Sequence, residues 1–288
     1  MPERSDFGRV MAEFLCETLL ILPFLFVTYL VLETVEAHAG GALERLLKRA
    51  HCIGPLAGAL AGAIPQCGIS AAAASFYAGG AVSVGTLLAV FLSTSDELLL
   101  VLISSRAPLP LLLKVAGIKV ICAIAVGFTA GGILSFIRHK RRDVSVSELC
   151  KHSHCGCSKH NGILVPALIH TAEIFLFIAA ISGAINLCMH FFGEECLLKL
   201  RLTEPIIGEL AAGALGLVPN CAVSVASAKL YLAGAMSPGA MMASSFAGSG
   251  LGLLVLFRTN RNMTENLVIL FSVYVIGVVL GLITGPLL

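Results

Sequence analysis

The chain has 288 residues, of which 57% are hydrophobic and only 12% are charged, and its mean hydropathy is +0.94. A soluble domain carries about twice this charged fraction, so the composition excludes an ordinary water-soluble protein. The formal net charge of +2 is small, and nothing in the sequence points to a nucleic-acid partner. The start MPERSDFGRV lacks the apolar core and small-residue cleavage site of a signal peptide, so we expect the first helix itself to direct targeting.

Long apolar stretches recur along the chain. Each is long enough to cross a bilayer core of about 30 Å, and glycine is frequent within them, as in closely packed membrane helices. The sequence therefore predicts an all-α polytopic protein whose surroundings are the lipid bilayer. The stretches are 11–32, 82–104, 109–137, 162–192, 230–257 and 266–288.

An internal repeat relates the two halves of the chain. Residues 64–103 align without a gap on residues 218–257 after a shift of 154, and 16 of the 40 pairs are identical. IPQCGISAAAASFYAGGAVSVG faces VPNCAVSVASAKLYLAGAMSPG, with Pro, Cys, Ser, Tyr and Gly in register. We predict a first half over 1–137, a loop over 138–162 and a second half over 163–288.

Each half contains one segment interrupted by proline, 53–80 in the first and 205–234 in the second. Proline removes a backbone donor and disfavours helix just before it. Such a break fits two half-helices that form a re-entrant hairpin. Each half then has three crossing helices plus a Pro-broken re-entrant hairpin, a 5+5 arrangement of two inverted structural repeats.

The loop charges favour this topology. With re-entrant hairpins and both termini outside, the cytoplasmic loops 36–52, 138–162 and 258–265 hold 11 Lys and Arg residues, against 5 outside. If both interrupted segments cross fully, the best count is about 9 against 8, and the positive-inside rule prefers the larger bias. Three further lysines lie in apolar segments: Lys114, Lys119 and Lys229.

The candidate site lies at the breaks. Gln66 and Cys67 in the first half, and Asn220 and Cys221 in the second, could form a partly dehydrated cation site with freed carbonyls, or could only satisfy open backbone groups. Ser95, Asp96 and Glu97 lie deep in the segment 82–104. Intramembrane carboxylates are costly and functional by default. Lys119 is a candidate charge partner for these acids.

Two further groups of potential ligands occur. Glu17, His170 and Glu173 lie in matching apolar segments, where they could bind metal, relay protons or form an interhelical hydrogen bond. The loop 138–162 packs soft or borderline ligands closely, as in a metal-capturing tether, although a polar linker would look the same. These loop residues are Cys150, His152, His154, Cys155, Cys157 and His160.

The segments IPQCGISAAAASFYAGGAVSVGTLLAVFLSTSDE and VPNCAVSVASAKLYLAGAMSPG, with the His/Cys-rich loop, resemble the ten-helix heavy-metal exporters. That family is also labelled manganese transporter and, earlier, arsenic efflux protein. The resemblance implies a multi-pass carrier in the plasma membrane of a prokaryote and agrees with five helices per half.

Oxygen ligands near the midplane suit manganese or another divalent cation. We therefore expect a secondary transporter that exports a divalent metal by alternating access, with the metal as substrate and no resident cofactor. The alternatives are an arsenical or oxyanion efflux permease using Cys67 and Cys221, and a membrane metal sensor or scaffold acting through the loop. No HExxH or nucleotide motif is present, so an enzyme is not expected. A coupling proton or sodium ion and a homo-oligomer stay open.

Overall fold

The fold is helical throughout the part of the chain that can be described. No strand occurs there, which confirms the all-α prediction for these residues. The computed structural model describes residues 22–23, 26–27, 30, 53–64, 67–94, 96–137, 168–169, 171–172, 175–176, 179–180, 202–219 and 221–288.

Among the described residues, five helices with defined bounds come from the first half and five from the second, followed by a short 3-10 turn, η1 (Gly285–Leu287). The first-half helices are α3 (Gly54–Gly62), α4 (Cys67–Ala78), α5 (Val84–Ser93), α6 (Asp96–Ser104) and α7 (Leu109–Ile137). The second-half helices are α10 (Ile207–Gly216), α11 (Cys221–Leu232), α12 (Pro238–Ala247), α13 (Gly252–Thr259) and α14 (Met263–Thr284).

Three stretches of the described residues are long and apolar enough to cross a membrane: Leu109–Gly132, Pro238–Thr259 and Met263–Leu287. The first and third turn many large apolar side chains outward; Ile121 is 68% exposed and Phe271 65%. A water-soluble protein would bury such side chains, whereas lipid accommodates them. The protein is therefore a helical membrane protein.

The helix boundaries repeat along the chain with the offset of 154 residues. Shifted by this offset, α4 falls on α11 and α5 on α12 without any change of bounds. The turn after α4 contains Gly80 at φ 74°, and the turn after α11 contains Gly234 at φ 71°, a conformation that glycine adopts without strain. Ser83 then caps α5 and Ser237 caps α12, each through its side-chain oxygen.

The interrupted segments fold back on themselves. Helix α3 runs alongside α5 in the same direction, because a Cβ added at Gly54 would meet Thr86 and one at Gly62 would meet Ser93. Helix α4 returns to the start of α5, where Ala81 N donates to Phe76 O in the connecting turn. The two ends of the α3–α4 hairpin therefore lie together, and its break between Gly62 and Cys67 lies near the end of α5. Helices α10 and α11 are arranged in the same way around α12.

The structure differs from the sequence prediction at the segment 82–104, which we expected to be one crossing helix. Helix α5 ends at Ser93 and α6 begins at Asp96, so this segment is broken in its middle. Its counterpart is broken too, between Ala247 at the end of α12 and Gly252 at the start of α13. Each half therefore contributes two breaks, one in its hairpin and one in the following segment.

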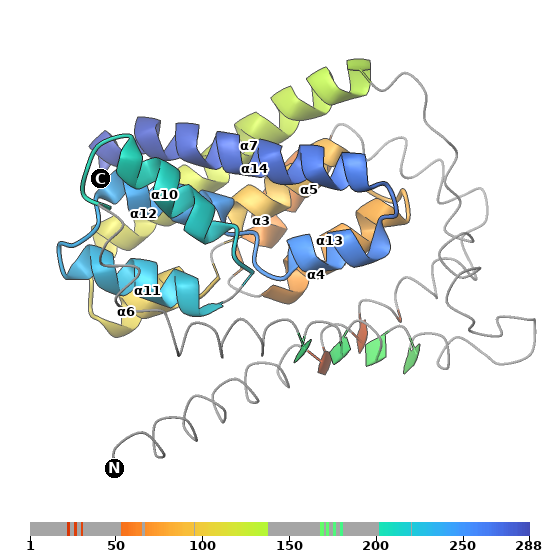
Figure 1. The fold of residues 1–288 in the computed structure, drawn as a ribbon, viewed down its shortest axis with the longest axis horizontal. Coiled ribbons are helices and arrows are strands. Elements are labelled where there is room, and N and C mark those ends of the chain that lie inside the picture. The colour runs from red at the N-terminus through yellow and green to blue at the C-terminus, as the bar shows by residue number, and fades with distance from the viewer. Residues whose placement is uncertain are drawn as a thin grey trace, which may run out of the picture.

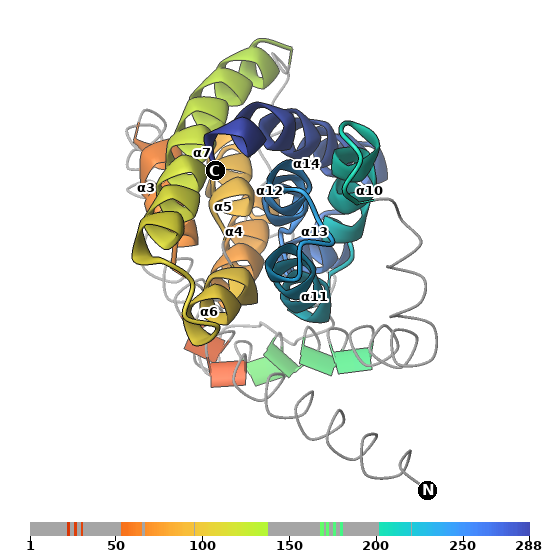
Figure 2. The same ribbon diagram turned by 90° about the vertical axis from the view of Figure 1, so that its left-hand side faces the viewer.

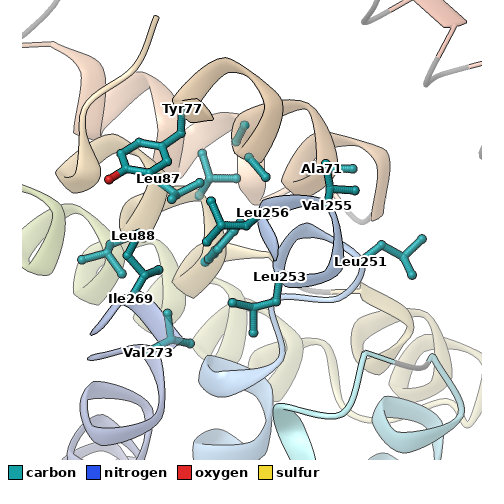
Figure 3. Packing of buried hydrophobic residues seen from close by; sticks show 14 of the residues in the cluster. Ala71, Tyr77, Leu87, Leu88, Leu251, Leu253, Val255, Leu256, Ile269 and Val273 are labelled. Carbon is teal, nitrogen blue, oxygen red and sulfur yellow. The ribbon is translucent and has the colours of Figure 1, made fainter. Parts of the chain in front are cut away.

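The two halves are held together by helices that pack across the boundary between them. Helix α4 of the first half packs on α13 of the second, and α11 of the second half packs on α6 of the first. Figure 1 shows these two pairs at opposite ends of the described helices. Figure 2, viewed from one of these ends, shows α5 and α12 side by side. Figure 3 shows the cluster at one end, where Leu87 of α5 lies near Leu256 of α13 and Val255 of α13 lies next to Ala71 of α4.

Candidate functional site at the helix breaks

The side chain of Lys119 joins the broken segments of the two halves. From α7, Lys119 Nζ donates to the carbonyl oxygen of Thr94, directly after α5, at 2.5 Å. It also donates to Ser245 near the end of α12, to the carbonyl oxygen at 2.8 Å and to Oγ at 2.6 Å. The ammonium group therefore connects the end of a first-half helix to the end of its second-half counterpart.

The surroundings of Lys119 favour a positive charge. The residue is fully buried, with 0% of its surface exposed. The last carbonyl groups of a helix carry partial negative charge, and here two helix ends face one ammonium group. The Phe246 ring adds a cation–π contact, with Nζ 5.7 Å from the ring centroid. Of the three lysines in apolar segments, Lys114 and Lys229 are exposed, so Lys119 alone is buried among them.

Buried hydroxyl groups surround these helix ends. Ser227 Oγ and Ser244 Oγ lie 3.0 Å apart, joining α11 to α12. Ser249, in the break between α12 and α13, is 1% exposed, and its Oγ has no hydrogen-bond partner among the described residues. Buried polar atoms almost always have a partner in folded proteins. A hydroxyl of this kind is available to a bound ion or substrate.

The hairpin breaks lie beside the same centre. A Cβ added at Gly62 would fall 2.1 Å from Ser93 Oγ, so the end of α3 contacts the end of α5. A Cβ at Gly216 would fall 2.3 Å from Ser244 O, so α10 ends against α12 in the same manner. The Pro-polar-Cys segments that follow Gly62 and Gly216 therefore begin next to the breaks after α5 and α12.

The structure describes only some of the predicted site residues. Cys67 and Cys221 begin α4 and α11, and Asp96 and Glu97 begin α6, two and three residues after Thr94. The structure describes the backbone of these four residues but not their side chains. The remaining predicted ligands lie outside the described residues; they are Gln66, Ser95, Asn220, Glu17, His170, Glu173, Cys150, His152, His154, Cys155, Cys157 and His160.

The part of the chain that the structure describes contains no cluster of three His, Cys, Asp or Glu side chains that could hold a metal ion. The hydrogen bonds described at Lys119 are instead to two backbone carbonyls and one hydroxyl. Sequence reasoning singled out Lys119 but missed Thr94 and Ser245 as its acceptors. A signal for Ser245 was present, because Ser244 and Ser245 replace Val90 and Phe91 of the first half in an otherwise apolar helix.

A second contact between the halves lies at the end of the molecule shown in Figure 3, where Tyr77 is labelled. Tyr77, at the end of α4, donates its hydroxyl hydrogen to the carboxylate of Glu265, at the start of α14. Tyr77 is 9% exposed. The repeat does not reproduce this bond, because the position equivalent to Glu265 in the first half is Leu111.

Removing the Tyr77 hydroxyl should loosen this end of the molecule. A hydrogen bond to a charged group contributes about 1.5–3 kcal/mol, so we expect Tyr77→Phe to speed local opening of α4 by roughly tenfold or more. Amide hydrogen–deuterium exchange of residues 76–82 measures this opening. Tyr231→Phe, the equivalent change in α11, is the matched control. Equal exchange in Tyr77→Phe and the unmodified protein would show that the bond does not hold the halves together.

One family model matches the chain over residues 18–208, more than half of its 288 residues, and it is described as "Putative, 10TM heavy-metal exporter". No curated protein and no solved structure matches the chain.

Proposed function

We propose that this chain, which belongs to the 10TM heavy-metal exporter family, exports a divalent metal cation, with manganese as the foremost candidate, by alternating access. The transport would be secondary, across the plasma membrane of a prokaryote, with the metal as substrate and no resident cofactor.

The arrangement of the helices supports inverted halves. Helices α7 and α14 occupy equivalent positions in the repeat, and Figure 1 shows that they run in opposite directions. The contact between Tyr77 and Glu265 brings the turn 79–83 to the same end as the loop 258–265. The charge bias of the loops assigns this end to the cytoplasm. The α3–α4 hairpin would then enter from the cytoplasm, and the α10–α11 hairpin from outside.

The observation that carries the proposal is the meeting of both broken segments at one buried polar centre. In secondary transporters with inverted repeats, substrates and ions bind where discontinuous helices end near the midplane. Here the Thr94 carbonyl and Ser245 share one ammonium group, and the Ser249 hydroxyl lies buried in the adjoining break. Non-helical backbone at this depth is tolerated when it lines such a site.

The metal site would lie beside this centre and use the acids that follow it, because the ammonium group of Lys119 already binds the Thr94 and Ser245 oxygens. Asp96 and Glu97 would supply negative charge, and Ser95 with the amides of Gln66 and Asn220 would supply neutral oxygens. Carboxylate and carbonyl oxygens suit manganese, whereas Cys67 and Cys221 would favour softer metals. Glu17, His170 and Glu173 would provide a second, proton- or metal-binding position.

Reconstitution into proteoliposomes tests the proposed function. Vesicles that contain the purified protein and a trapped metal-sensitive dye should report manganese entry down its gradient, and empty vesicles should not. Flux measurements with zinc, nickel and arsenite in parallel determine the selectivity of the transporter. Absence of flux for every divalent cation would contradict the proposal.

Two alternatives are decided by the same assay. Arsenite or arsenate flux that depends on Cys67 and Cys221, without manganese flux, would establish an oxyanion or arsenical permease. A metal sensor or scaffold would bind metal through loop residues 138–162 without transporting it. If the loop instead captures metal for export, its deletion should raise the manganese concentration needed for half-maximal flux.

A further inference from the structure

We infer that the oxygen cage around Lys119 is a site for a monovalent inorganic cation, and that the Lys119 ammonium group permanently takes the place of that ion. The consequence is a transporter that needs no sodium or potassium at this position. Removal of the lysine side chain should then create a site for one of these ions. The inference rests on the geometry at Lys119 and holds whether or not manganese is the cargo.

The cage supplies three oxygen ligands of the kind that bind a monovalent cation. Two backbone carbonyls and one hydroxyl converge on a single point, the nitrogen of Lys119, from distances of 2.5 to 2.8 Å. In broken-helix transporters, carbonyls at unwound turns and at the C-terminal ends of half-helices coordinate sodium or take part in proton coupling. The oxygens of Thr94 and Ser245 come from two such ends, one in each half.

Only the first half supplies a positively charged side chain to the cage. The repeat counterpart of Lys119 is Val273 of α14, which is also fully buried but carries no polar group. A symmetric pair of cations at the centre would repel each other, and one ammonium group serves both helix ends without that cost. Because the side chain is anchored on α7, this charge cannot dissociate as a free ion would.

Loss of the ammonium group would leave the cage oxygens facing one another without a donor. Buried acceptors without a partner are unfavourable, and a small cation or a water molecule would restore their interactions. The volume vacated by the lysine side chain lies against the Phe246 ring, which also favours a cation over a neutral molecule. Sodium or potassium is therefore the expected occupant in the variant.

The test is the thermal stability of purified protein in detergent, measured in sodium chloride, potassium chloride or choline chloride at equal ionic strength. Lys119→Ala should melt below the unmodified protein in choline chloride and should recover by about 3 °C in sodium or potassium at ten times the dissociation constant. The unmodified protein should respond equally to all three salts. Lys114→Ala, which removes an exposed lysine from the same helix, should behave like the unmodified protein.

Further variants define the ion site. Ser245→Ala in the Lys119→Ala background should weaken the salt response by removing one cage oxygen. Lys119→Ser, which leaves a hydroxyl in the cage, should bind about one radioactive sodium ion per chain, and the unmodified protein should bind none there. The inference would be overturned if the melting temperature of Lys119→Ala were the same in all three salts. It would also be overturned if sodium raised the melting temperature of the unmodified protein as much as that of the variant. These readouts require no metal flux, so their failure is distinct from failure of the export proposal.

Discussion

Replacement of Asp96 by asparagine should lower manganese flux by roughly 100-fold or more. Asp96 is the first residue of α6, two residues after the Thr94 carbonyl that binds Lys119. Removing one member of a buried charge pair costs about 3–5 kcal/mol, and each 1.4 kcal/mol is a factor of ten in affinity. Asparagine keeps the size of the side chain, so the change removes charge and little else. Initial rates in proteoliposomes across a range of manganese concentrations measure the effect.

The control for Asp96→Asn is Glu204→Gln, an equivalent loss of charge in the turn before α10. We expect that variant to retain flux. Glu97→Gln should have a smaller effect than Asp96→Asn if only one of the two acids faces the ion, because neighbouring helix positions point about 100° apart. Undiminished flux in Asp96→Asn would show that the metal binds elsewhere.

The sequence predicted the hairpin breaks because their signals are local. Proline at positions 65 and 219 disfavours helix in the residue before it, and the structure ends α3 at Gly62 and α10 at Gly216. The turns after α4 and α11 were also marked by matching glycines, Gly80 and Gly234. Such features depend on a few neighbouring residues, so they could be read without knowledge of the tertiary structure.

The break between α5 and α6 carries no proline or glycine and was missed. Ser93 Oγ and Thr94 Oγ1 both donate to Val90 O, at 3.0 and 2.7 Å. Hydroxyl groups that bond to a backbone carbonyl in this way compete with the regular helix pattern. In the second half the equivalent break is formed by glycines instead. Gly248 is the C-cap residue of α12, and Gly250 has a φ of 54°. The two halves thus share the position of the break but not its cause.

The centre of the site depends on contacts that no local pattern reveals. Lys119 lies 126 residues from Ser245 in the chain, and their hydrogen bond follows from the packing of α7 on α5 and of α5 on α12. The sequence indicated that a lysine in an apolar segment needs a partner, and it suggested the nearby acids. The neutral acceptors Thr94 and Ser245 became evident only from the fold, and a charge contact with Asp96 or Glu97 stays a prediction.

The helix that carries Lys119 is held in place by close contact of small residues. A Cβ added at Gly127 of α7 would lie 2.8 Å from Pro55 Cβ, 2.9 Å from Ala89 Cβ and 3.0 Å from Gly85 O. The second half has the same contact between Gly239 and Gly281. In a membrane, where lipid is as apolar as the side chains, such close packing supplies much of the attraction between helices.

Gly127→Val should therefore lower the melting temperature by roughly 5–10 °C, since overpacking costs about 1–3 kcal/mol and this position also meets backbone. Gly117→Val is the matched control, because it makes the same change in α7 at a position where a Cβ meets nothing within 4 Å. Lys119 lies two turns, about 12 Å, from Gly127, so a displaced α7 would also draw its ammonium group away from Thr94. We accordingly expect Gly127→Val to lose metal flux even in the fraction that remains folded. Equal melting temperatures of Gly127→Val and Gly117→Val would contradict the packing of α5 on α7.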